Sequence, residues 1–83
     1  MEKKVGVVDD YFAKVGVAAL VLEGDLTTAD TIHIKGHTTD LTQVVGSMQI
    51  QHLKVEKAKK KDSVGIKVSD RVRKGDLVYK VTP

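Results

Sequence analysis

The stretch QVVGSMQIQHLKVEKAKKKDSVGIKV, residues 43–68, decides the fold expected for this chain. Its first part, from Val44 to Gln51, alternates between two faces with a period of two, and its second part repeats this period from Val64 to Val68. A period of two is typical of a half-buried β-strand. The link between the two parts, residues 57–62, is too charged to be buried. Two such strands can bury their apolar faces only within a larger sheet or barrel.

Further short strands are predicted on both sides of this stretch. They cover residues 4–8, 15–22 and 31–35 before it and residues 77–81 after it, without a convincing amphipathic helix. Short strands separated by regularly spaced turn residues predict an all-β sandwich or barrel, here with about six strands. A sheet this small needs closure, because open edges invite aggregation. The predicted core consists of Val44, Met48, Ile50, Val64, Ile66, Leu77 and Tyr79.

Particular residues within these strands carry further expectations. Gly6 indicates a bulge or a close backbone approach, and Gly65 is expected to let a neighbouring strand or side chain approach the backbone. Residues 15–22 are apolar on both faces, which predicts a strand buried on two sides or covered by a neighbouring segment. The aromatic residues of the chain, expected to be core anchors rather than a base-stacking platform, are Tyr11, Phe12 and Tyr79.

Length and composition limit the classes of protein to consider. The 83 residues predict a single domain spanning residues 1–83. The chain has no cysteine, which excludes disulfides and thiolate chemistry. Its longest apolar run, residues 15–22, is far shorter than the ~20 residues of a membrane span. The first residues lack a hydrophobic signal region, so we expect a cytoplasmic protein.

The sequence provides no convincing catalytic or metal site. His33 and His37 lie on a strand and its following loop, so they do not share a face, and a zinc ion would need a third ligand such as Asp40 or His52. No serine lies in a G-x-S-x-G motif, and both Gly-rich phosphate-binding motifs are absent. We therefore expect no catalytic residue, no metal, no cofactor and no nucleotide site, and hence no enzyme activity.

The residues SMQIQH at 47–52, followed by DSVGIKV at 62–68, resemble the second domain of translation GTPases such as elongation factor Tu. This resemblance covers nearly the whole chain and implies a closed six-stranded Greek-key barrel of the translation-factor type. That family has Gly at the positions of Ala29 and Lys61. The Lys61 departure suggests either a different turn geometry or a tolerated left-handed residue. The stretches IKGHTTD (34–40) and VGSMQI (45–50) also resemble the barrel appended to collagenase-like peptidases.

The translation-factor resemblance implies a position for a binding pocket. In proteins of the elongation factor Tu type, this barrel contacts the aminoacylated 3′ end of transfer RNA. The corresponding positions of this chain are Gln49, Gln51, His52 and Ser63. All four differ from the Glu, His, Arg and Asn that are common in the family, so the position of the pocket transfers more safely than its ligand.

Charge is distributed unevenly along the chain. Residues 1–40 hold four Lys and seven Asp or Glu, whereas residues 41–83 hold ten Lys or Arg and four Asp or Glu. A basic half can indicate an anionic partner, although lysines also protect exposed strand edges. No aromatic residue interrupts the basic link, so it could hold phosphates but not stack bases. The candidate phosphate contacts are Lys54, Lys57, Lys59, Lys60, Lys61, Arg71, Arg73 and Lys74.

Two functional interpretations follow from these observations. The first is a non-catalytic, free-standing β-barrel module that binds RNA or a translation component. The alternative is an accessory protein-interaction subunit that docks on a separately encoded enzyme or GTPase. Neither interpretation involves a membrane.

Overall fold

Ten β-strands make up the regular structure of the chain in the computed structural model, which describes residues 1–82. The strands are β1 (Glu2–Phe12), β2 (Val17–Leu22), β3 (Leu26–Thr27), β4 (Thr31–Lys35), β5 (Asp40–Val44), β6 (Met48–Ile50), β7 (Leu53–Val55), β8 (Lys57–Ala58), β9 (Ser63–Lys67) and β10 (Leu77–Val81). None of the described residues forms a helix, so none provides a helical membrane span. The prediction of an all-β fold is confirmed.

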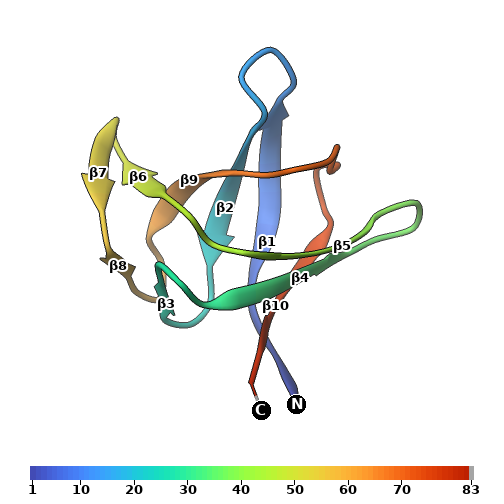
Figure 1. Cartoon of the computed structure of the whole chain (residues 1–83), viewed down its shortest axis with the longest axis horizontal. Helices are drawn as coiled ribbons and strands as arrows, with labels where there is room; N and C mark the ends of the chain where they lie inside the picture. Colours follow the sequence, from blue (N-terminus) through green and yellow to red (C-terminus); the bar gives the residue numbers. More distant parts are fainter. Residues whose placement is uncertain (83) are drawn as a thin grey trace.

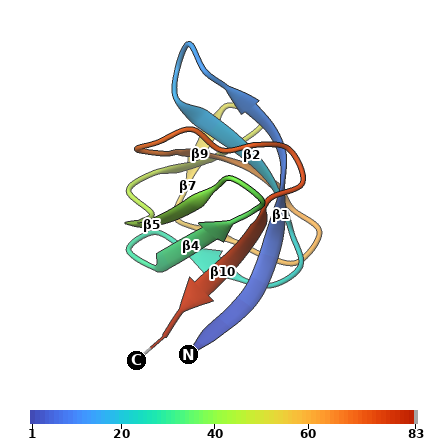
Figure 2. The same cartoon turned by 90° about the vertical axis from the view of Figure 1, so that its right-hand side faces the viewer.

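The strands form one large sheet and one small sheet, not the closed six-stranded barrel that was predicted. The large sheet has the order β5-β4-β10-β1-β2-β9-β6-β7, and β3 pairs with β8 in the small one. Figures 1 and 2 show the large sheet curling around the interior. Its end strands β5 and β7 do not pair with each other within residues 1–82. The sheet is therefore open, and the prediction of a closed barrel was wrong.

The interior of the curled sheet holds the apolar core. Its central strand pairings are antiparallel: β2 pairs with β1 on one side and with β9 on the other. Burying this apolar surface supplies the main stabilising free energy of a domain of this size. The fully buried larger side chains are Val5, Val8, Leu20, Leu22, Leu26, Ile32, Ile34, Val45, Met48, Val64, Ile66 and Val72. The burial of Met48, Val64 and Ile66 confirms that part of the predicted core.

The alternation predicted from Val44 to Gln51 fails at its beginning. Strand β5 ends at Val44, which is 57% exposed, and the chain bends so that Val45 is buried instead. The bend is held by two hydrogen bonds, because the Val45 N–H donates to the Asp30 carbonyl and the Val45 carbonyl accepts from the Ala29 N–H. A hydrogen bond to a distant segment therefore outweighs the local period. Ile50 is only partly buried and packs against the core.

The last strand is also predicted in the wrong register. Val78 is fully buried, whereas Leu77 and Tyr79 are only partly buried. The residues that point inward are Asp76, which is 6% exposed, and Val78, so the alternation is shifted by one residue from the predicted one. An Asp76 carboxylate oxygen accepts a hydrogen bond from the Arg73 N–H at 2.8 Å, which fixes this residue inside the turn before β10. The turn thus sets which face of β10 points inward.

Strand β1 is longer than predicted and contains the expected irregularity at Gly6. The pairing of β1 with β10 shifts between Lys4 and Gly6, as a β-bulge requires. A Cβ atom at Gly6 would lie 2.8 Å from the Val21 carbonyl oxygen. The close backbone approach expected at this glycine is therefore confirmed. The ends of the chain also meet, because the Thr82 N–H donates to the Met1 carbonyl at 2.7 Å (Figure 2).

Two residues for which the translation-factor resemblance implied glycine adopt left-handed backbone conformations. Ala29 has φ of 75° and Lys61 has φ of 78°. Each has a reason to stay there: the Ala29 N–H donates to Val45, and the Lys61 N–H donates to the Leu22 carbonyl at 2.9 Å. For Lys61, the interpretation as a tolerated left-handed residue is confirmed. The left-handed conformation places an L-residue under steric strain.

Candidate binding groove

All four sequence-predicted pocket residues line one groove on the outer face of the sheet. The groove has a volume of about 770 Å³. It runs over strands β2, β9 and β6, between the β1–β2 hairpin tip and the β6–β7 turn. Its lining residues are Phe12, Lys14, Val15, Val17, Ala19, Gln49, Gln51, His52, Ser63, Val64 and Gly65. The structure therefore brings Gln49, Gln51, His52 and Ser63 together.

The floor of the groove is a row of paired residues across three neighbouring strands, and the row continues outside the groove to Lys54 of β7. Ala19 of β2 pairs with Gly65 of β9, Gly65 pairs with Gln49 of β6, and Gln49 pairs with Lys54 of β7. Paired residues on adjacent strands place their side chains on the same face. Two of the smallest residues therefore stand side by side, and the missing side-chain volume is what hollows the surface.

One wall of the groove is the tip of the β1–β2 hairpin, which projects beyond the sheet (Figure 1). The N–H groups of Val15 and Gly16 both donate to the Phe12 carbonyl, and Gly16 has a φ of 66°. This compact turn leaves Phe12 50% and Val15 58% exposed. Phe12 is thus not the core anchor that was expected, although Tyr11 does pack against the core.

The opposite wall is the two-residue turn between β6 and β7. Gln51 and His52 have φ values of 52° and 66°, and Ile50 pairs with Leu53 across them. Positive φ at both central residues is the geometry of a type I′ hairpin turn, which usually contains Asn or Gly. Both side chains line the groove, so this turn presents two polar groups that Asn-Gly would not supply.

The groove combines an apolar lining with a positive edge. Five of its lining residues are Phe, Val or Ala, and none is acidic. Lys14 lies on the hairpin wall and forms no ion pair with another described residue. Lys54 of β7 pairs with Gln49 and stands just outside the lining. Such a surface suits a ligand that offers apolar groups together with negative charge.

The predicted phosphate contacts do not gather in one place. Five of them follow β6 along strands β7 and β8 and the next turn, whereas Arg71, Arg73 and Lys74 lie in the β9–β10 connection. Figure 1 shows these two segments on opposite sides of the molecule. All eight are exposed, and none lines the groove. Lys57 and Lys59 also line a shallow pocket together with Asp25 and Asp62, so acidic groups stand among them.

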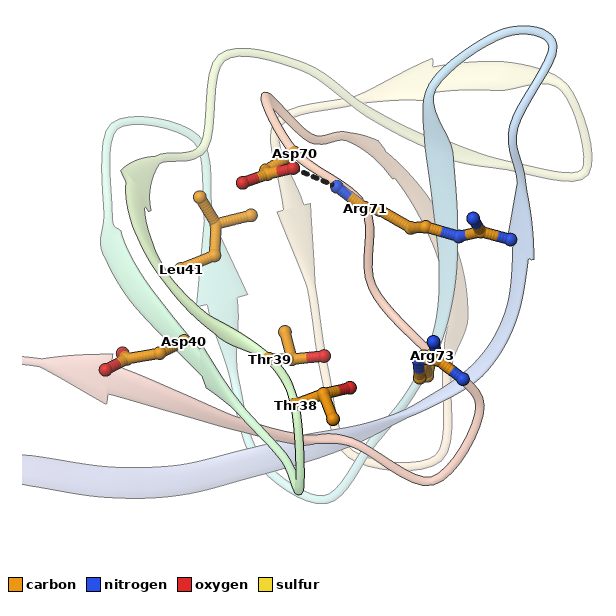
Figure 3. A pocket seen from close by; sticks show the side chains of 7 residues that line it. All are labelled: Thr38, Thr39, Asp40, Leu41, Asp70, Arg71 and Arg73. Carbon is orange, nitrogen blue, oxygen red and sulfur yellow. Dashed lines mark hydrogen bonds between the residues drawn. The ribbon is translucent and has the colours of Figure 1, made fainter.

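Two basic residues of the β9–β10 connection stand at a second, smaller cavity of about 390 Å³ (Figure 3). Arg71 and Arg73 line it together with two acidic residues, Asp40 and Asp70. An Asp70 oxygen accepts a hydrogen bond from the Arg71 N–H at 2.7 Å. This lining has no excess of positive charge and little apolar surface, so it favours neither an anion nor an apolar ligand.

His33 of β4 stands between two carboxylates, Glu2 of β1 and Asp40 of β5. Its Nδ1 lies 2.8 Å from Glu2 Oε2, and its Nε2 lies 2.5 Å from Asp40 Oδ1. The hydrogen bonds to Asp40 and Glu2 raise the pKa of His33 above its usual value of 6.5, against the opposing effect of burial. Both ring nitrogens can donate only in the imidazolium form. Within residues 1–82, His, Asp and Glu form no group of three with metal-binding geometry.

Sequence reasoning missed the residues of the hairpin wall. Phe12 was assigned to the core, and Lys14, Val15, Val17 and Ala19 were not considered as site residues. A signal was present, since residues 15–22 are apolar on both faces while β2 is fully buried on one face only. An apolar outer face on a strand indicates a surface that another molecule could cover.

Comparisons with known proteins point to peptidases. The chain is 48% identical over 77 residues to an uncharacterized protease of Methanocaldococcus jannaschii, a match that covers 92% of this chain and 19% of the protease. It is 38% identical over 72 residues to a collagenase of Porphyromonas gingivalis, covering 84% of this chain and 20% of the collagenase. The chain thus spans about a fifth of the length of these relatives. No protein-family model matches it.

Solved structures agree with this result at the level of the fold. The C-terminal domain of a putative U32 peptidase of Geobacillus thermoleovorans superposes with a TM-score of 0.88 at 18% identity, covering 94% of this chain and 91% of that domain. A selenomethionine variant of the same domain gives a TM-score of 0.87 at 18% identity, covering 92% of this chain and 96% of that one. These matches support the resemblance to collagenase-like peptidases but not the resemblance to translation factors. The chain is homologous to a segment of these peptidases, and its fold is that of a U32 peptidase C-terminal domain.

Proposed function

We propose that this chain is a non-catalytic accessory domain that docks on a peptidase of the U32 and collagenase type, and that the groove is its docking surface. The main observation behind the proposal is that a chain homologous to part of a peptidase exposes apolar side chains at the groove. Phe12 and Val15 are two of the six large hydrophobic residues exposed on the described chain, and both stand on one wall of the groove. Apolar surface that gathers in this way is typical of protein contact sites.

The relatives' length supports an accessory role. The homologous segment is about a fifth of each peptidase, so most of each relative lies outside it. Binding to RNA has less support, because the eight basic candidates divide into two separate sets and none lines the groove. Phosphate binding along a strand of RNA needs a continuous positive track.

A binding titration with matched variants tests the docking proposal. The partner is the M. jannaschii protease without its homologous segment, once its own thermal transition shows that it is folded. Val15→Ser should weaken binding about tenfold or more, since it removes an apolar contact from the groove wall. Val44→Ser is the control, because Val44 is exposed to nearly the same degree, 57% against 58%, but lies outside the groove. Equal affinities for the two variants would contradict the proposal.

The absence of catalysis in this chain is part of the proposal and has its own test. The purified chain should release no fragments from denatured collagen or casein. Hydrolysis that co-purifies with the chain, and that a groove substitution such as Phe12→Ser removes, would show that the chain is itself an enzyme.

A further inference from the structure

Resting on the proposed function, we infer that the groove binds an extended segment of its partner in which an apolar side chain and a carboxylate lie two residues apart. The apolar side chain occupies the hollow above Ala19 and Gly65. The carboxylate meets Lys14 on the hairpin wall. The partner is therefore recognised by an apolar and acidic motif, not by a nucleic acid.

The hollow is shaped for one apolar side chain. Its floor consists of Ala19 and Gly65, and a Cβ atom at Gly65 would lie only 3.3 Å from Val17 Cγ1. Val17 therefore borders the hollow closely, and Phe12 and Val15 extend the apolar surface upward. A leucine-sized side chain placed there would bury apolar surface against these residues, which favours its binding.

The charge around the hollow favours a negatively charged group next to the bound apolar side chain. Among the eleven residues of the groove lining, Lys14 is basic and none is acidic. Lys14 forms no ion pair with a described residue, so its ammonium group is available to a ligand. The backbone that carries Lys14 is restrained, since the turn around it is held by the two hydrogen bonds to the Phe12 carbonyl.

The polar wall fits the backbone of an extended segment. Gln49 and Gln51 each line the groove and carry a carboxamide that can donate and accept hydrogen bonds. A carboxamide matches the donor and acceptor pattern of a peptide group. In an extended segment, side chains two residues apart point to the same side, so both recognised groups can face the groove together.

Short peptides test this inference separately from docking. The parent peptide is acetyl-Ser-Gly-Leu-Ser-Glu-Gly-Ser-amide, and its variants replace Leu by Ser or Glu by Gln. Binding to the isotope-labelled chain is followed by NMR shifts up to millimolar peptide. We expect loss of the leucine to weaken binding about tenfold or more, in line with its burial. Loss of the carboxylate should weaken binding about two- to fivefold, as for an exposed ion pair.

A double-mutant comparison assigns the carboxylate to Lys14. Lys14→Gln should weaken the parent peptide by the same factor as the Glu-to-Gln change, and the two changes together should weaken it no further. Lys14→Arg should restore binding, while Lys57→Gln, outside the groove, should have no effect. Additive losses, or equal binding of all peptides, would overturn the inference. If the peptidase binds through the groove but the parent peptide does not, the inference fails and the proposed function stands.

Discussion

The side chain of Gln43 joins strand β5 to Ser69, which lies just beyond the end of β9. Gln43 Oε1 accepts a hydrogen bond from the Ser69 N–H at 2.8 Å, and Gln43 Nε2 donates to the Lys67 carbonyl at 2.8 Å. A single carboxamide thus bridges two segments that are not neighbours in the sheet order. This bridge holds one open edge of the curled sheet in place without a ladder of backbone hydrogen bonds.

Removing this bridge should loosen the edge of the sheet. We expect Gln43→Ala to lower the free energy of unfolding by about 1–2 kcal/mol, because two hydrogen bonds to backbone groups are lost. The exposed neighbour Thr42 provides the control, and Thr42→Ala should change stability by less than about 0.5 kcal/mol. Urea denaturation measures both values. Equal effects of the two substitutions would show that the bridge contributes nothing.

Gly65 should be required for both stability and the groove. A Cβ atom added there would lie 3.3 Å from Val17 Cγ1, so Gly65→Val should destabilise the domain by about 1–3 kcal/mol. Its side chain would also fill the hollow and abolish partner binding. Gly46→Val is the matched control, since nothing lies within 4 Å of a Cβ atom at Gly46. A denaturation midpoint unchanged by Gly65→Val would refute this role.

Glycine at the two left-handed positions should stabilise the domain. We expect Ala29→Gly and Lys61→Gly each to raise the free energy of unfolding by roughly 0.5–1 kcal/mol, because relief of the αL strain exceeds the entropy that glycine adds to the unfolded chain. Lys60 is the control: it is exposed in the same turn and is not among the residues with positive φ. Lys60→Gly should therefore destabilise. Thermal melting distinguishes the signs, and a loss of stability at both positions would contradict the strain argument.

His33 should make stability depend on pH. Its pKa in the folded state is raised by hydrogen bonds to Asp40 and Glu2, so its contribution is complete below the unfolded value of about 6.5. The contribution is lost as pH rises through the folded pKa. The difference in unfolding free energy between wild type and His33→Gln should thus be largest near pH 6 and shrink toward pH 9. A difference independent of pH would show that the imidazolium is not stabilised by these carboxylates.

One part of the site could be predicted from the sequence, because it follows from the alternation of side chains along a β-strand. Gln49 alternates with buried Met48, and Ser63 and Gly65 alternate with buried Val64, so their outward direction and their shared face depend only on the local period. The all-β class follows from the same period. The position of the pocket came from the family resemblance, and the structure places those residues together.

The remainder depends on contacts between distant residues. Val45 turns inward because Ala29 and Asp30 hydrogen-bond to it, and Val78 turns inward because Asp76 is fixed in the preceding turn. Neither effect is visible in a local pattern. The exposure of Phe12 depends on how far the β1–β2 hairpin projects beyond the sheet. Closure of the sheet requires its end strands to pair with each other, and the alternation within single strands does not determine which strands pair.

The most direct test of the central claim is to map the surface that the peptidase covers. The isotope-labelled chain is titrated with the M. jannaschii protease without its homologous segment, and the loss of amide signal intensity is followed by NMR for each residue. We expect the strongest early losses at Lys14, Val15, Gln49, Gln51 and Gly65. Losses centred on residues 57–61 or 71–74, with the groove unaffected, would contradict the claim.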